Sequence, residues 1–175
     1  MTEPEVSLRI AMKYIQNEAA CQDITVSIDG AHIKTLNTIH FDIATFMDKH
    51  GYLKCDNDYN RWQGLYQRID SPIRINICSK SGIGDITIAL RDGKTLYIES
   101  KKFKTGSGGE YPAMREAIGQ LITGCPDDEN VIPIVAIPYS SKSFELSQKW
   151  SSNKRICGAG IHFMLVHPDG EITFV

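Results

Sequence analysis

The chain contains few of the features that mark specialised classes of protein. Its cysteines are odd in number, are spread along the 175 residues and include no Cys-x-x-Cys pair. This usage indicates neither a disulfide framework nor a zinc ribbon. We therefore expect reduced, mostly buried thiols at the five positions, Cys21, Cys55, Cys78, Cys125 and Cys157.

Long apolar runs and an excess of one charge are also missing. No stretch approaches the roughly 18 apolar residues of a membrane span, and the first residues lack the basic and apolar regions of a secretory signal. We therefore expect a soluble, cytoplasmic protein with no membrane partner. The 19 Lys and Arg residues nearly balance the 21 Asp and Glu residues, which argues against a protein that binds nucleic acid over its whole surface.

The composition is that of an ordinary folded domain. Hydrophobic residues make up 42% of the chain and charged residues 23%, which is enough apolar content for one core in a chain of this length. No internal repeat or low-complexity segment is visible.

Two apolar segments in the middle of the chain carry acidic residues at one end. Residues 84–90 place Asp85 at the head of a strand pattern, and residues 96–101 end on Glu99 and Lys101. Residues two apart in a strand point to the same face, so Glu99 and Lys101 share one. Charges beside a core strand are costly to desolvate unless they have partners. A divalent cation held between Asp85 and Glu99 would supply one.

The loop between these strands decides whether the two carboxylates meet. A two-residue turn would place Asp85 and Glu99 on opposite faces and build no site. A three-residue loop, Arg91-Asp92-Gly93, sets Asp85 opposite Glu99 when the glycine adopts the left-handed conformation. We predict the three-residue loop.

Asp85, thirteen intervening residues and then Glu99-Ser100-Lys101 resemble the motif of the PD-(D/E)xK nuclease superfamily, with Ile-Gly-Asp in place of its Pro-Asp. A predicted helix over residues 112–124 and a predicted strand over residues 131–137 follow, in the order found in that superfamily's core. The resemblance covers roughly residues 70 to 138.

The resemblance implies a fold of the α/β (α+β) class, with a central mixed β-sheet flanked by helices and a restriction-endonuclease-like core. We expect one nuclease domain over residues 1–175. Residues 1–69 form an N-terminal elaboration, residues 70–138 the catalytic core, and residues 139–175 a C-terminal helix and hairpin.

Local signals predict the elements that flank this core. A capping box of Thr2 and Glu5 begins an N-terminal helix, and Asp-Gly pairs mark hairpin turns. The predicted elements are a hairpin over residues 23–35 about Asp29-Gly30, helices over 41–49, 57–67 and 143–154, and a hairpin over 161–175.

The resemblance also assigns roles within the site. Asp85, Glu99 and the backbone carbonyl of Ser100 are hard oxygen ligands that suit Mg²⁺ or Mn²⁺. Lys101 stabilises charge on the phosphoryl oxygens, and Gln120 orients the nucleophile or Lys101. An N-terminal helix in this superfamily sometimes supplies a further acid, for which the candidates are Glu5 and Glu18.

Local charge predicts a positive rim around this site. Six basic residues against three acidic ones lie between Lys80 and Lys104, and two of the acids are the proposed metal ligands. Lys80, Lys102 and Lys104 are the candidate nucleic-acid contacts. Arg91 and Lys94, beside the predicted turn, are interpreted as solvated.

We expect a metal-dependent endonuclease that hydrolyses phosphodiester bonds of DNA. Cutting both strands of a duplex would require two sites, hence a homodimer or larger assembly. Two alternatives stay open. One is a catalytically silent module on the same fold, which binds nucleic acid or protein and keeps the charged cluster as a structural ion pair. The other is an accidental match of solvent-facing residues. The choice between DNA and RNA also stays open.

Overall fold

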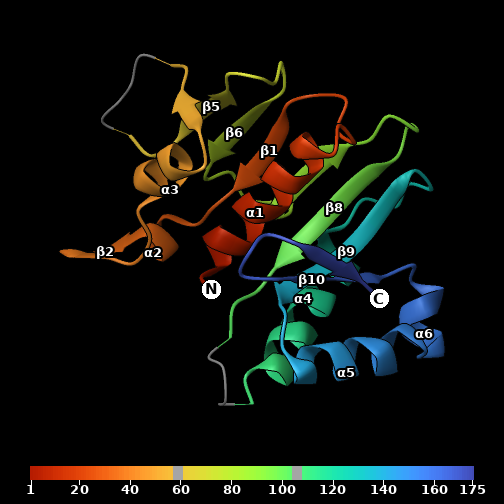
Figure 1. The fold of residues 1–175 in the computed structure, drawn as a ribbon. Coiled ribbons are helices and arrows are strands. Elements are labelled where there is room, and N and C mark those ends of the chain that lie inside the picture. Colours follow the sequence, from red (N-terminus) through yellow and green to blue (C-terminus); the bar gives the residue numbers. More distant parts are fainter. Residues whose placement is uncertain (57–60, 104–107) are drawn as a thin grey trace.

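The computed structural model describes residues 1–56, 61–103 and 108–175 (Figure 1). It has a large mixed β-sheet flanked by helices, as the predicted fold class requires. The helices are α1 (Glu3–Gln16), α2 (Gly30–Ile33), α3 (Ile43–Lys49), α4 (Glu110–Gly124), α5 (Ser141–Ser151) and α6 (Lys154–Gly158).

The described strands form one nine-stranded sheet in the order β11-β10-β9-β8-β7-β1-β6-β5-β4 and a separate pair, β2-β3. Their bounds are β1 (Ile24–Ser27), β2 (Lys34–Thr35), β3 (Thr38–Ile39), β4 (Tyr52–Lys54), β5 (Gly64–Arg68), β6 (Arg74–Cys78), β7 (Ile86–Ala89), β8 (Thr95–Ser100), β9 (Val131–Pro138), β10 (His162–Val166) and β11 (Ile172–Phe174).

Strand directions at the centre of the sheet bring three chain segments to one edge. β7 is antiparallel to both β1 and β8, so β1 and β8 run the same way, and β6 is parallel to β1. The carboxyl ends of β1, β6 and β8 therefore meet at the edge where β7 begins. Edges of this kind commonly hold ligands in α/β proteins.

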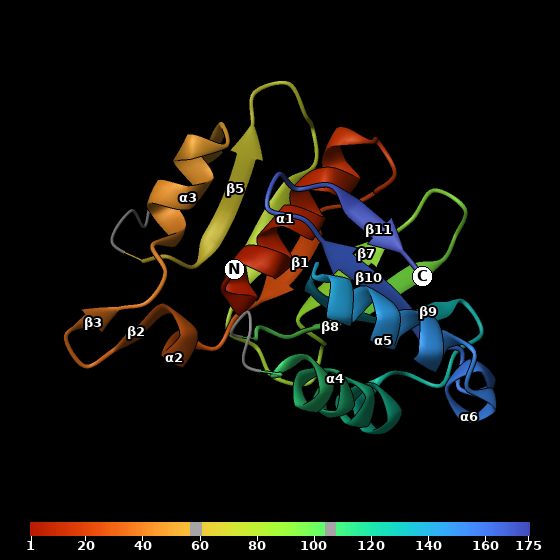
Figure 2. The ribbon, with the colours of Figure 1, turned by 60° about the horizontal axis from the view of Figure 1, so that its bottom comes forward.

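Helices cover both faces of β8, which is why its sequence is apolar on both sides. Leu96 and Ile98 pack in the cluster that contains the buried side of α1, whereas Tyr97 packs with Met114 and Leu121 of α4. Figure 2 shows α1 and α4 on opposite sides of the sheet. Beyond β8, the α4 face of β7 and β1 carries half-buried Thr and Ser side chains.

The β7–β8 hairpin has the predicted register. Ile86 pairs with Ile98 and Ala89 with Thr95, which places Asp85 opposite Glu99. The Leu90 N–H donates to the Lys94 carbonyl at 2.8 Å. The loop is therefore Arg91-Asp92-Gly93, with a φ of 86° at Gly93.

Several other predicted elements are confirmed. Thr2 and Glu5 form the capping box of α1, and α3, α4 and β9 lie where the sequence predicts them. The predicted helix over 143–154 is α5, which is followed by the short α6. β10 and β11 form the C-terminal hairpin, with a φ of 90° at Gly170.

Two predicted elements are wrong. The segment 23–35 is not a hairpin: after β1, the Asp29 side chain accepts a hydrogen bond from the Ala31 N–H and starts α2 instead. The predicted helix over 57–67 fails in its described part, because residues 64–68 form β5 between β4 and β6. Pairing with the neighbouring strands β4 and β6 outweighs local helix preference there.

The N-terminal third of the chain contributes the centre of the sheet. Within residues 70–138, β6 precedes β7 in sequence, yet β1 lies between them and pairs with both. Residues 1–69 therefore supply the direct neighbour of the Asp85 strand, and α1 contacts β1, β7 and β8.

The expectation of mostly buried thiols is also wrong. Cys21, Cys55 and Cys157 are exposed, and Cys78 and Cys125 are half-buried. All five are free thiols. Among the described helices, none is long and apolar enough to cross a membrane.

The turn at Gly93 yields a stability prediction. Gly93→Ala should lower the free energy of unfolding by about 1 kcal/mol, since a side chain disfavours positive φ, although an added Cβ would meet no atom within 4 Å. Gly119→Ala, on the exposed side of α4 with the same open space, should raise it by about 0.5–1 kcal/mol. Denaturant unfolding measures both. Equal effects of the two substitutions would contradict the conformational argument.

Candidate functional site

A cleft of about 580 Å³ opens at the edge of the sheet where β1, β6 and β8 end. Its walls are the end of β1 with the start of α2, the loop between β6 and β7, the end of β8, and the C-terminal half of α4. Its lining residues include Asp29, Lys80, Asp85, Glu99 and Gln120. The cleft thus contains both predicted carboxylates.

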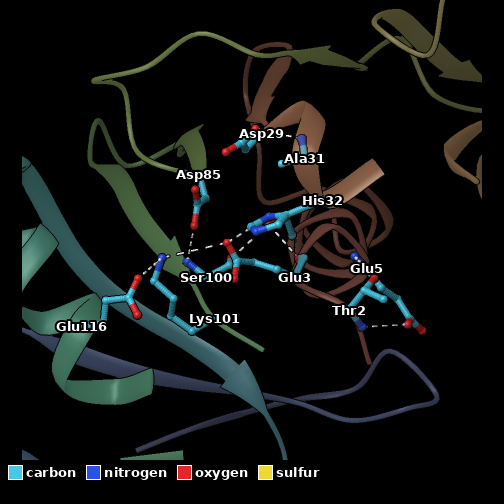
Figure 3. Close-up of polar contacts among 11 residues, drawn as sticks. Thr2, Glu3, Glu5, Asp29, Ala31, His32, Asp85, Ser100, Lys101 and Glu116 are labelled. Atoms are coloured by element: carbon cyan, nitrogen blue, oxygen red, sulfur yellow. Dashed lines mark hydrogen bonds and ion pairs between the residues drawn. The ribbon is translucent and has the colours of Figure 1, made fainter. Parts of the chain in front are cut away.

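Asp85 is held in place by backbone hydrogen bonds on both sides. Its N–H donates to the Ile98 carbonyl at 3.0 Å, and its carbonyl accepts from the Ser27 N–H at 2.8 Å. Its side-chain Oδ2 accepts from the Ser100 N–H at 2.7 Å (Figure 3). The carboxylate is therefore anchored to the strand that carries Glu99.

Gly84 allows the chain to enter β7 at this point. It has a φ of 71°, and an added Cβ would lie 3.0 Å from two ring atoms of Tyr97. Both the backbone conformation and the close approach to the ring favour glycine. The Gly-Asp pair in the sequence thus has a structural reason.

Glu99 lies across the hairpin from Asp85 and is only 8% exposed. Burial, together with the adjacent Asp85 carboxylate, raises the pKa of Glu99 to about 7. Burial likewise raises the pKa of Asp85 to about 6, although the Ser100 N–H and Lys101 act in the opposite direction. Two neighbouring carboxyl groups in a water-poor site favour one shared proton over two negative charges.

This pair fits a hard divalent cation. A cation placed between two carboxylates offsets the repulsion that otherwise retains a proton, and Mg²⁺ commonly binds through one or two carboxylates with waters completing its shell. Among the described residues, no three Asp, Glu, His or Cys side chains lie close enough together to ligate one metal ion. A cation at this position would therefore have two carboxylates and backbone oxygens as its donors from the described residues.

The Ser100 carbonyl is placed to be the backbone donor. Carbonyls two residues apart in a strand point to the same neighbouring strand, and the Ile98 carbonyl accepts the Asp85 N–H. The Ser100 carbonyl therefore points to the Asp85 side of β8. The Ser100 side chain points to the other face, where the Ser7 hydroxyl donates to its Oγ at 3.0 Å.

Lys101 follows the end of β8 and is held by two carboxylates from different helices. Its Nζ lies 3.4 Å from an oxygen of Glu116 on α4 and 3.9 Å from an oxygen of Glu3 on α1 (Figure 3). Lys101 is 8% exposed. The ammonium group is thus held between α1 and α4, and its charge acts on both Asp85 and Glu99.

Glu3 is the acidic residue of α1 at the site, in place of the predicted Glu5 or Glu18. Glu5 is engaged by the Thr2 cap and by Arg9, and Glu18 is exposed near Arg91. Burial raises the pKa of Glu3, while Lys101 and Lys102 oppose that shift. The capping box fixes where α1 begins, but which turn faces the sheet edge depends on tertiary packing.

His32 of α2 is a second residue that sequence reasoning missed. Its Nδ1 lies 3.4 Å from an oxygen of Glu3, and it lines a small cavity of about 40 Å³ together with Glu3, Asp29 and Asp85. Burial and the nearby charge of Lys102 lower the pKa of His32. The failed hairpin prediction over 23–35 is the reason it was overlooked.

The remaining predicted site residues divide into three groups. Gln120 and Lys80 line the cleft. Lys102 is exposed and lies close enough to His32 and Glu3 to influence both electrostatically. Lys104 lies outside the described residues.

Comparison with protein families, with characterised proteins and with solved structures finds no match to this chain.

Removing one carboxylate of the pair should stabilise the metal-free protein. The pKa of Glu99 is higher in the folded chain, so the folded state binds more protons and the free energy of unfolding falls as pH rises from about 4.3 toward 7. At pH 8 with chelator, Glu99→Gln should raise this free energy by of order 1–3 kcal/mol, measured by denaturant unfolding. Exposed Glu129→Gln is the control.

Adding Mn²⁺ should raise the melting temperature of the wild-type protein and leave that of Glu99→Gln unchanged, because ligand binding stabilises only a chain that can bind it. An equal rise in both proteins would place the cation elsewhere.

Replacing Gly84 should destabilise the protein more than replacing the nearby Gly82 does. Gly82 and Gly84 both have positive φ, but only at Gly84 would a Cβ approach Tyr97. Gly84→Ala should therefore cost about 2 kcal/mol of stability and Gly82→Ala about 1 kcal/mol, measured by thermal unfolding. Identical losses would show that the ring contact contributes nothing.

Proposed function

We propose that the chain is a metal-dependent endonuclease that hydrolyses phosphodiester bonds of DNA and has a restriction-endonuclease-like core. The observation that carries the proposal is the Asp85–Glu99 carboxylate pair, set opposite each other at a cleft, with the Lys101 ammonium held nearby. Two acids that can hold a divalent cation and a nearby lysine are one set of groups that can hydrolyse a phosphodiester.

The carboxylates would hold Mg²⁺ or Mn²⁺ through Asp85 and Glu99, with the Ser100 carbonyl as a further oxygen donor. When bound, the cation supplies Lewis-acid polarisation of the phosphate and lowers the pKa of a water. The Ser100 N–H holds the Asp85 carboxylate in place before any ligand arrives, so this part of the site is preorganised.

Lys101 would stabilise the negative charge that develops on the phosphoryl oxygens. A fixed ammonium in a site with little water acts more strongly on such charge than a solvated one. Glu116 and Glu3 restrict where the ammonium lies. Gln120, across the cleft on α4, has the donor and acceptor needed to orient a water or the lysine.

The cleft and its rim suit a nucleic acid backbone. Its volume lies within the range of ligand-binding clefts, and Lys80 on its wall and Lys102 nearby offer positive charge to phosphate. Because the overall charge is −2 and Asp29 also lines the cleft, approach of a phosphate would depend on these two lysines and on a bound cation.

A silent binding module is the second candidate, and one observation favours it. Lys101 is paired with Glu116 and lies near Glu3, as a structural ion pair would be. That pairing can be explained without any role for Lys101 in stabilising charge on a phosphate. The carboxylate pair, in contrast, has no stabilising role in such a module, because its mutual repulsion opposes folding.

The decisive experiment measures cleavage of supercoiled, linear, single-stranded and branched DNA, and of RNA, with Mg²⁺ or Mn²⁺. Asp85→Ala and Lys101→Ala should each lower the rate by about 10²-fold or more. Lys94→Ala, at the far end of the same hairpin, should retain the wild-type rate. Near-normal cleavage by Lys101→Ala would refute its role. Silence of the wild type on every substrate, without Mn²⁺ binding, would favour the binding module.

A further inference from the structure

The β2–β3 hairpin stands apart from the rest of the molecule. Its two strands pair only with each other, and residues 34–40 are exposed. In Figures 1 and 2 the hairpin extends outward beyond α2, away from the sheet. A short two-stranded hairpin without packing is at best marginally stable in water, so its persistence calls for an explanation outside the core.

Leu36 at the hairpin tip is the unexpected residue. It is 91% exposed and has a φ of 52°, in a turn position where hairpins usually place glycine or asparagine. Leucine there adds backbone strain and exposes an apolar side chain to water, while burying nothing within this chain. Strain combined with exposure indicates a contact made with another molecule.

The base of the hairpin is fixed, so the tip has a defined direction. The Ile33 side chain is buried at the end of α2, and its carbonyl accepts the His40 N–H at 2.8 Å. The His40 Nε2 lies 3.0 Å from the Thr35 Oγ1, which ties the two strands together.

The hairpin begins beside the proposed active site. α2 starts at Gly30, which lines the cleft, and His32 contacts Glu3. Leu36 is six positions after Gly30, so the tip lies at most about 22 Å from the cleft wall. One turn of B-DNA spans about 34 Å, so the distance from the cleft to the tip is shorter than one helical turn of a duplex.

The hairpin itself carries no acidic side chain that would repel a phosphate. Its residues 34–40 include Lys34 and no Asp or Glu. Closer to the cleft both signs of charge are present, because Lys102 and Asp29 act electrostatically on His32 and Lys80 lines the cleft together with Asp29. Thr35, Asn37 and Thr38 add hydroxyl and amide groups around the apolar tip, a mixture that suits groove edges and backbone oxygens.

We propose that the β2–β3 hairpin is a duplex wedge, in which Leu36 inserts between base pairs of the DNA whose phosphate lies in the cleft. Apolar side chains that enter base steps from a groove are a known way to kink DNA. This inference rests on the proposed function, because the cleft is taken to hold the duplex. It names distortable double-stranded DNA as the substrate class.

The test uses duplexes of about 30 base pairs that carry 2-aminopurine at successive positions, and the full chain in a Lys101→Ala background to prevent cutting. Binding should raise 2-aminopurine fluorescence at one position near the bound phosphate, because unstacking removes quenching. Leu36→Asn should lose this rise and bind about tenfold more weakly. Leu36→Met should retain both, since it keeps an apolar side chain.

Asparagine accepts positive φ readily, so Leu36→Asn should melt at the wild-type temperature or higher. Unchanged affinity and fluorescence for folded Leu36→Asn would overturn the wedge, as would an absence of duplex binding by the parent. Sedimentation tests whether a second copy of this chain, instead of DNA, binds the hairpin tip. A dimer that Leu36→Asn dissociates would identify the hairpin as a contact between copies and also overturn the proposal.

Cleavage by the otherwise wild-type chain separates this inference from the proposed function. DNA cutting that Leu36→Asn leaves unaffected would refute the wedge and leave the nuclease standing. A Leu36-dependent fluorescence rise without cutting by the wild type would support the wedge and refute the nuclease.

Discussion

The pairing of β7 with β8 is the constraint on which the site depends. Side chains alternate between faces in a strand, so a shift of one residue would separate Asp85 from Glu99. The three-residue loop ending at Gly93 sets the register from one end, and the Asp85 N–H bond to the Ile98 carbonyl holds it at the other. β1 and β9, which flank this hairpin in the sheet, keep the pair from sliding.

That constraint brings two carboxylates together at a cost to stability. Burial and mutual repulsion raise the pKa of both Asp85 and Glu99, so each opposes folding near neutral pH. Apolar packing on both faces of β8 offsets this cost, because Leu96 and Ile98 are buried on one side and Tyr97 on the other. The pair therefore lowers the stability of the protein at the end of a strand that is buried on both faces.

The parts of the fold predictable from sequence are those set by local signals. A capping box defines the start of α1, and turn glycines define the β7–β8 and β10–β11 hairpins. The register then follows, and with it the opposition of Asp85 and Glu99. Sequence therefore predicts the carboxylate pair because a single short loop decides it.

The parts that sequence did not predict depend on contacts between distant segments. β5 pairs with its sequence neighbours β4 and β6, but nothing local indicates that β1 inserts between β6 and β7. Glu3 and His32 reach the site for the same reason, since α1 and α2 are positioned by the sheet. Both side chains lie outside residues 70–138, the part of the chain that carries the motif.

The central place of β1 has a consequence for recognition. The chain leaves the site edge at the end of β1 and returns to it at Asp85, so residues 28–84 begin and end at the cleft. This segment supplies the start of α2, the β2–β3 hairpin and the loop with Lys80. Two of these surfaces, the start of α2 and the loop with Lys80, form one side of the cleft, and the end of β8 with α4 forms the other. If the cleft holds the ligand of the proposed nuclease, the β7–β8 hairpin would supply the carboxylates and the segment between β1 and β7 would supply much of the surface that the ligand contacts.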